Sequence, residues 1–178
     1  DRGLRLCFNI GNLVGINTHS KQVIVKIDLN HFAAAKTTIE RIPINRNQLS
    51  FVIKTYNMSS LMASKIAAIL LRGQRGGVDG ILYEEKGRDI YDLLWYMNKK
   101  IVPDLDYLKA KNIDIANLRA LFDKLTLKMN KVDNANLKND LSPLFVDQTF
   151  IGNWLKNWVE SYMRLRGEYR INTITTLK

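Results

Sequence analysis

The spacing of apolar residues changes along this chain, and the change limits the folds that the chain can adopt. From Pro103 onward, apolar residues recur at the intervals of amphipathic helices, in segments around 104–111, 115–131, 134–146 and 150–166. Nearer the N-terminus they form short runs or alternate with polar residues, as they do in β-strands. The sequence therefore predicts an α+β fold, with strands first, a central helix pair and a helical C-terminal part.

Three segments of the N-terminal half are predicted strands: residues 4–10, 23–29 and 51–56. In the second, apolar residues alternate with a lysine and Asp28, which places Asp28 on the polar side of its strand. The first contains Cys7, for which we expect a buried and inert thiol. After the third, Ser59 or Ser60 is the expected N-cap of a helix that continues to about Arg72.

Positive charge is concentrated in the first half of the chain. The formal net charge is +10, and residues 1–75 carry 11 lysines and arginines against three acidic residues, whereas the remainder carries 16 against 14. Such a surface attracts polyanions, and nucleotide phosphates or RNA are the natural candidates. The alternative is a basic surface with no such partner.

The apolar runs are too short for a membrane span. The longest covers residues 66–71, whereas a spanning helix needs roughly 20 apolar residues. One cysteine in the whole sequence excludes an intrachain disulfide, which fits a reducing compartment. We therefore expect a cytoplasmic protein that makes no membrane contact.

Two predicted helices near the centre of the sequence carry the residues that could bind a ligand or take part in catalysis. On the first, Lys65 shares a stripe with apolar neighbours at offsets of three and four, so its ammonium either extends to solvent or points at an anion. A glycine-rich segment, residues 73–80, follows without the spacing of a phosphate-binding loop, and we expect a flexible connection there.

The second helix begins "GRDIYDLLWYM" and allows two interpretations. In one, Asp89 complements the helix dipole and Arg88 forms an ordinary surface ion pair with Asp92. In the other, Asp89 and Asp92 share one face at a metal–phosphate site that Asp28 also approaches. Mg²⁺ prefers carboxylate oxygens and substrate phosphates, and Lys65 would neutralise charge during phosphoryl or nucleotidyl transfer.

The pair "SLMASKIAAILLR" and "KGRDIYDLLWYM" resembles the AbiEii/AbiGii-type nucleotidyltransferase toxins. Their hallmark is a helix with a central lysine in an A-x-K context, followed by R-D-x-Y-D-L. The matching residues here are Ala63, Lys65, Arg72, Arg88, Asp89, Tyr91, Asp92 and Leu93. The segments "VIVKIDLN" and "FVIKTYNMSSL" are similar to strands of the same family, so that the resemblance covers roughly residues 4–100.

The resemblance implies a fold and a reaction. The fold is the remnant of a polymerase-β-like nucleotidyltransferase core with a short antiparallel or mixed sheet, in residues 1–100, followed by a helical domain, 101–178. The reaction is Mg²⁺-dependent transfer of a nucleotide from an NTP to an acceptor such as tRNA, by a toxin of a toxin–antitoxin or phage-defence system with a possible antitoxin partner.

The resemblance also implies roles for individual residues. Lys65 would contact the triphosphate and Asp89 would be the essential acid of the motif. Asp92 and Arg88 would support the helix, with Arg88 near the nucleotide, and Asp28 is the candidate metal ligand. On this interpretation, Asp89→Asn abolishes transfer and leaves the fold intact.

One element of the family pattern is missing from the sequence. These enzymes carry a Gly-Gly/Ser turn followed by an Asp-x-Asp pair that supplies the main metal ligands, and that arrangement does not occur within the 178 residues. We therefore expect a fragment that begins just after this first motif and is inactive alone. The alternative functions are a non-catalytic RNA-binding module and an interaction domain that binds a partner through the amphipathic helix 150–166.

Overall fold

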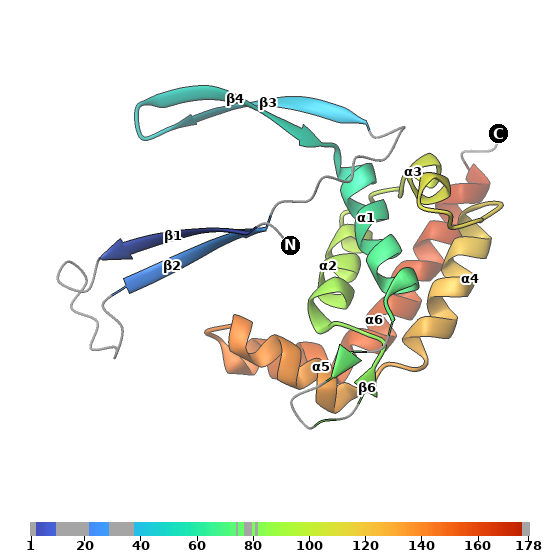
Figure 1. Ribbon diagram of the computed structural model, residues 1–178. Coiled ribbons are helices and arrows are strands. Elements are labelled where there is room, and N and C mark those ends of the chain that lie inside the picture. Colours follow the sequence, from blue (N-terminus) through green and yellow to red (C-terminus); the bar gives the residue numbers. More distant parts are fainter. Residues whose placement is uncertain are drawn as a thin grey trace. The chain divides into compact units, whose positions relative to one another are not determined.

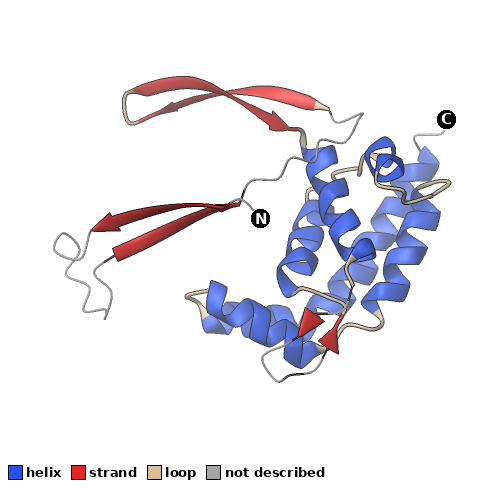
Figure 2. Ribbon diagram, in the orientation of Figure 1, coloured by secondary structure: helices blue, strands red, loops and turns tan. Residues whose placement is uncertain are grey.

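The structure, a computed structural model, describes residues 3–9, 22–28, 38–73, 75–76, 80 and 82–175. Over those ranges the fold is α+β, as predicted, with six α-helices and three two-stranded antiparallel hairpins (Figures 1 and 2). Contacts between residues divide the chain into two compact units, Asp1–Ala33 and Ala34–Lys178. None of the described helices is long and apolar enough to cross a membrane.

The first unit contains a hairpin of two predicted strands. β1 (Gly3–Asn9) pairs with β2 (Gln22–Asp28), with Leu6 opposite Val25. Cys7 is exposed, so the prediction of a buried thiol was wrong. The reason is that an isolated two-stranded ribbon has no second layer to cover its faces, and the described side chains of both strands are exposed.

The second hairpin contains a strand that the sequence did not reveal. β3 (Ile39–Arg46) pairs with the expected β4 (Leu49–Tyr56). The turn residues Asn47 and Gln48 both have positive φ, 50° and 63°, as a two-residue hairpin turn requires. Pro43 lies within β3, and a proline is tolerated there because a two-stranded hairpin leaves one edge of each strand unpaired.

The central helix begins earlier in the sequence than predicted. α1 (Met58–Leu71) is capped by Asn57, whose Oδ1 accepts a hydrogen bond of 2.8 Å from the Ser60 backbone N–H, so neither Ser59 nor Ser60 is the N-cap. Ser60 is buried instead, and its hydroxyl donates to Asp104 Oδ2 over 3.1 Å. That hydrogen bond connects the start of α1 to Asp104, the N-cap residue of the helix at Leu105–Ala110.

The remaining elements follow the predicted order. A short hairpin, β5 (Arg75–Gly76) with β6 (Leu82–Tyr83), leads to α2 (Gly87–Asn98). The C-terminal helices are α3 (Leu105–Ala110), α4 (Leu118–Met129), α5 (Asn134–Leu141), with the 3₁₀ turn η1 (Ser142–Leu144), and α6 (Gln148–Thr175).

A single hydrophobic core joins these helices. α1 packs against α2, α3 and α4, and α6 packs against α2, α4 and α5 (Figure 1). Met62, Leu93 and Leu125, from α1, α2 and α4, are all fully buried in it. The functional division at residue 100 stays a prediction, but the packing of the helices continues across that position.

The apolar face predicted for residues 150–166 is confirmed. Ile151, Trp158, Tyr162 and Leu165 are buried. Trp158 is part of the core and not an exposed base-stacking surface, and its indole Nε1–H donates to Asn134 Oδ1 over 2.9 Å. The helix itself is longer than predicted and reaches Thr175.

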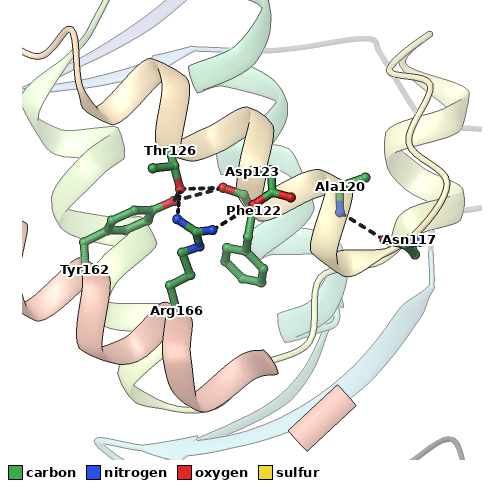
Figure 3. Close-up of polar contacts among 7 residues, drawn as sticks. All are labelled: Asn117, Ala120, Phe122, Asp123, Thr126, Tyr162 and Arg166. Carbon is green, nitrogen blue, oxygen red and sulfur yellow. Dashed lines mark hydrogen bonds and ion pairs between the residues drawn. The ribbon is translucent and has the colours of Figure 1, made fainter. Parts of the chain in front are cut away.

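A polar cluster fixes α6 against α4 (Figure 3). The Arg166 guanidinium forms an ion pair with Asp123 Oδ1 at 2.7 Å and donates to Thr126 Oγ1 at 2.9 Å. Thr126 Oγ1 lies 3.0 Å from the Tyr162 hydroxyl and donates to the Phe122 carbonyl at 2.7 Å. This network sets the register of the two helices, because each hydrogen bond would be lost if one helix slid along the other.

We expect the stability of the chain to fall in alkaline solution because of two tyrosines. Burial raises the pKa of both Tyr162 and Tyr169, which means that the fold favours their neutral form. Their contribution is fully present below the pKa of an unfolded tyrosine, about 10, and is lost as the pH rises through the raised values. In urea unfolding experiments, the midpoint concentration of urea should be constant from pH 7 to about pH 10 and should fall between about pH 10 and pH 11. A Tyr162→Phe, Tyr169→Phe variant that declines just as steeply would contradict this assignment.

Candidate functional site

Four charged side chains alternate in sign where α1 packs against α2. Lys65 Nζ lies 2.7 Å from Asp92 Oδ2 and 3.4 Å from Asp89 Oδ1. On its other oxygen, Asp89 forms an ion pair with Arg72 Nη2. Lys65 and Arg72 are seven residues apart, two turns of α1, whereas Asp89 and Asp92 are one turn apart on α2. We call Lys65, Arg72, Asp89 and Asp92 the four-charge cluster.

Burial in this cluster differs between its centre and its rim. The Asp89 side chain is 10% exposed, whereas those of Lys65, Arg72 and Asp92 are 35%, 27% and 39% exposed. The buried carboxylate thus holds two cations that both reach solvent. Such an arrangement can present two fixed positive groups to an anionic ligand.

The electrostatic surroundings keep Lys65 charged. Burial by itself would lower the pKa of the Lys65 ammonium, but the hydrogen bond to Asp92 and the charges of Asp92 and Asp89 outweigh it and raise the pKa above its ordinary value. Lys65 is therefore a cation across the physiological range. It is suited to bind an anion and unsuited to act as a general base.

The structure brings together three of the residues that the sequence singled out. Lys65, Asp89 and Asp92 are in contact. Arg88 is exposed and has no ion pair with Asp92 in the described part of the chain, so that predicted pair was wrong: Asp92 turns to Lys65 instead. Asp28 lies in β2 as predicted, but its side chain is outside the description that the structure gives.

Arg72 is a site residue for which the sequence predicts no role of its own. It follows the last residue of α1 and reaches Asp89 from there. Its Nε is buried and has no hydrogen-bond partner among the described residues. The seven-residue separation from Lys65 was the available signal, because it places both side chains on one face of a helix.

The start of α2, which positions Asp89, is held by helices far along the chain. Lys86, the N-cap residue, makes no side-chain cap, and Asp140 Oδ2 of α5 accepts a hydrogen bond of 2.7 Å from the Gly87 N–H. A Cβ on Gly87 would lie 2.9 Å from Asp140 Cβ, closer than such atoms approach, so the contact requires glycine.

Two further contacts hold the segment that leads into α2. Glu84 forms an ion pair of 2.6 Å with Lys128 of α4. Glu85 accepts a hydrogen bond of 2.7 Å from the buried Asn136 of α5. The position of Asp89 therefore depends on α4 and α5 as well as on its own helix.

Comparison with protein families adds an independent observation. The model of the family described as nucleotidyl transferase AbiEii toxin, Type IV TA system, matches residues 1–156. The chain belongs to this family. No curated protein and no solved structure matches the chain. The AbiEii match spans both the hairpins and the four-charge cluster, and it confirms the resemblance that the motifs indicated.

The described carboxylates of this AbiEii-family chain do not fit a magnesium site. Both oxygens of Asp89 already face cations, and Asp92 is paired with Lys65. A metal ion would have to displace an ammonium or a guanidinium from each acid. Within the described residues there is also no group of three or more acidic, histidine or cysteine side chains that could hold a metal.

Two other sequence features, an Asp-x-Asp sequence and the glycine-rich segment, do not add to the site. Asp104 and Asp106 form an Asp-x-Asp sequence, but Asp104 is the N-cap of α3, where it accepts from the Tyr107 N–H at 3.0 Å. The glycine-rich segment 73–80, expected to be a flexible connection, is described only at 73, 75–76 and 80. Two of those residues form β5.

Proposed function

We propose that the four-charge cluster binds the triphosphate of an NTP and that the protein transfers a nucleotide to RNA, with tRNA as the expected acceptor. The observation that supports this most is the pair of partly exposed cations, Lys65 and Arg72, fixed by one buried carboxylate. Membership of a nucleotidyl transferase toxin family is consistent with that chemistry and implies an antitoxin partner. We also propose that the protein acts in the cytoplasm.

The four residues have different roles in this proposal. Lys65 and Arg72 donate to phosphate oxygens, and a guanidinium can do so through two parallel N–H groups. Asp89 and Asp92 are positioning residues that aim these cations. In this proposal Arg88, which is exposed on the same helix, contacts the outer part of the nucleotide.

Metal binding is assigned to neither acid of the cluster. The Mg²⁺ that the family resemblance implies would be held by other carboxylates, and Asp28 is the candidate from sequence. We therefore propose that transfer depends on carboxylates outside the four-charge cluster, whereas phosphate binding by Lys65 and Arg72 does not.

Nucleotide binding by the 178-residue chain is the first test. We expect Lys65→Met and Arg72→Met each to weaken NTP binding by about tenfold, because a hydrogen bond to a charged group contributes about 1.5–3 kcal/mol. Titration calorimetry with each NTP measures this directly. Lys124→Met, which changes an exposed lysine on α4, is the matched control and should bind as tightly as the wild type. Equal affinity in all four proteins would overturn the assignment.

Transfer is tested on the full gene product with each labelled NTP, Mg²⁺ and total cellular RNA. We expect label in a tRNA-sized band from the wild type and at most a trace from Lys65→Met. A folded wild-type protein that binds RNA but labels nothing would overturn the enzyme assignment. It would support the alternative of a non-catalytic RNA-binding module.

One observation favours RNA contact under both functions. The hairpin of β3 and β4 places two cations directly opposite each other, Arg41 with Lys54. Like charges at such positions are destabilising, and a phosphate backbone between them would offset the repulsion. The binding-module alternative predicts salt-sensitive RNA binding that is indifferent to Lys65 and to Mg²⁺.

A further inference from the structure

A groove between α2 and α6 lies on the face of α2 next to the four-charge cluster. Its volume is about 200 Å³, and its floor contains Leu94 and Leu165. Aromatic and polar side chains from both helices form its walls: Tyr91, Trp95, Asn98, Trp154, Ser161 and Arg164. A groove of this size is below the range of about 300–1,000 Å³ for whole drug-sized ligands, and it suits a single ring system.

Trp95 is the unusual member of this wall. It is 44% exposed, although tryptophan is highly buried on average. Its ring makes an edge contact with Tyr96 at 5.1 Å between centroids, and the Lys99 ammonium lies 5.7 Å from its centroid. Trp95 therefore presents an aromatic surface to solvent, with a cation over its ring.

Other aromatic rings at the groove contact one another. Trp154 contacts Tyr91 at 5.2 Å and is stacked near the buried Trp158 at 6.4 Å between centroids. Tyr91 in turn contacts Phe145 at 5.1 Å. Because these rings are held by one another, the wall is formed before any ligand arrives, which lowers the entropic cost of binding.

The charges at the groove favour an anionic ligand. Arg164 lines the groove and Lys99 lies at Trp95. Glu168 pairs with Arg164 at 2.7 Å and approaches Lys100 at 4.0 Å. Aromatic platforms interleaved with cations are the means by which proteins hold single-stranded nucleic acid without reading sequence strictly. Asn98 and Ser161 add hydrogen-bonding groups of the kind that contact base edges.

We propose that the α2–α6 groove binds an unpaired nucleobase of the acceptor RNA, stacked on Trp95, while Lys99 and Arg164 contact the flanking phosphates. The inference rests on the proposed function and extends it, because it names the part of the acceptor that is held. Since Trp95 and Asp92 are one turn apart on α2, a base in the groove would bring its strand to the four-charge cluster.

The test is the binding of oligo(A) and oligo(U) single strands, followed by tryptophan fluorescence and by filter binding. We expect Trp95→Ala to weaken binding by about tenfold, as the loss of one stacking platform does, and Trp95→Phe to retain most of it. Met163→Ala removes an apolar side chain of similar exposure, 50%, on the opposite face of α6 and should change nothing. Equal binding by all variants would overturn the proposal.

Two further measurements separate the possible occupants. NTP affinity should be the same in wild type and Trp95→Ala; a tenfold loss there would mean that the groove holds the base of the NTP and overturn the acceptor assignment. With the full gene product, Trp95→Ala should raise the KM for RNA and leave the KM for NTP unchanged. Another outcome is a wild type that binds single-stranded RNA through Trp95 and yet transfers no nucleotide. That result would overturn the proposed enzymatic function but support the groove as an RNA-binding site. Loss of antitoxin binding in Trp95→Ala, with RNA binding intact, would reassign the groove to a protein partner.

Discussion

Asp89→Asn is expected to lower the free energy of unfolding by about 2–3 kcal/mol as well as to weaken NTP binding. Removing one partner of a fully buried ion pair costs about 3–5 kcal/mol, because the remaining charge is left without compensation. Here the cost is smaller, because Arg72 is 27% exposed and Lys65 keeps Asp92. The sequence alone predicts loss of transfer with an intact fold, and the burial of Asp89 changes that expectation.

Urea denaturation of the 178-residue chain measures this effect. Asp92→Asn is the matched control, because the same change at a side chain that is 39% exposed should cost less than about 1 kcal/mol. Asp89→Asn combined with Arg72→Met should recover part of the lost stability, since the uncompensated guanidinium is gone. An Asp89→Asn protein as stable as the wild type would contradict the buried pair as a structural element.

Leu125→Ala should destabilise the whole helical core by about 3 kcal/mol, within the range for a buried leucine. Leu125 is fully buried on α4, in the cluster that also contains Met62 of α1 and Leu93 of α2. Because those helices share one core, we expect them to unfold together. Hydrogen exchange should therefore show lower protection in α1 and α2 as well as in α4.

Leu127→Ala is a control on the same helix. Leu127 is 67% exposed, so its truncation should change stability by no more than about 0.5 kcal/mol. If Leu125→Ala lowered protection in α4 and α6 while α1 and α2 kept theirs, the helices would be two folding units divided near residue 100.

The fold class could be predicted because apolar periodicity is a local property. The helical spacing of residues 150–166 and the alternation in residues 23–29 correspond to α6 and β2. β3 was missed because it contains a proline and three charged residues among its eight, which does not resemble a strand. Its pairing with β4 is also not a local property. The prediction that Cys7 is buried was wrong for a related reason. An apolar run shows which side chains could be buried, but it does not show whether another part of the chain packs against them.

The site could be predicted in part for the same reason. Lys65 on one helix and Asp89 with Asp92 on the next were visible as spacings, and the structure adds that they touch. The pairing of Asp92 with Lys65 rather than Arg88 depends on how two helices pack. The hydrogen bond from Gly87 to Asp140 spans more than 50 positions, and no pattern in the sequence indicates it.

That hydrogen bond has a practical consequence for experiments that shorten the gene. A series of truncations from the C-terminus would remove Asp140 while every residue of the four-charge cluster was still encoded. The series would remove α6 first, whose Trp158 and Tyr162 are buried in the core, and then Asp140. The first inactive member would therefore mark where α2 loses its support, and not where the last residue that touches substrate lies. The shortest active segment and the segment that carries the four-charge cluster are therefore expected to have different ends.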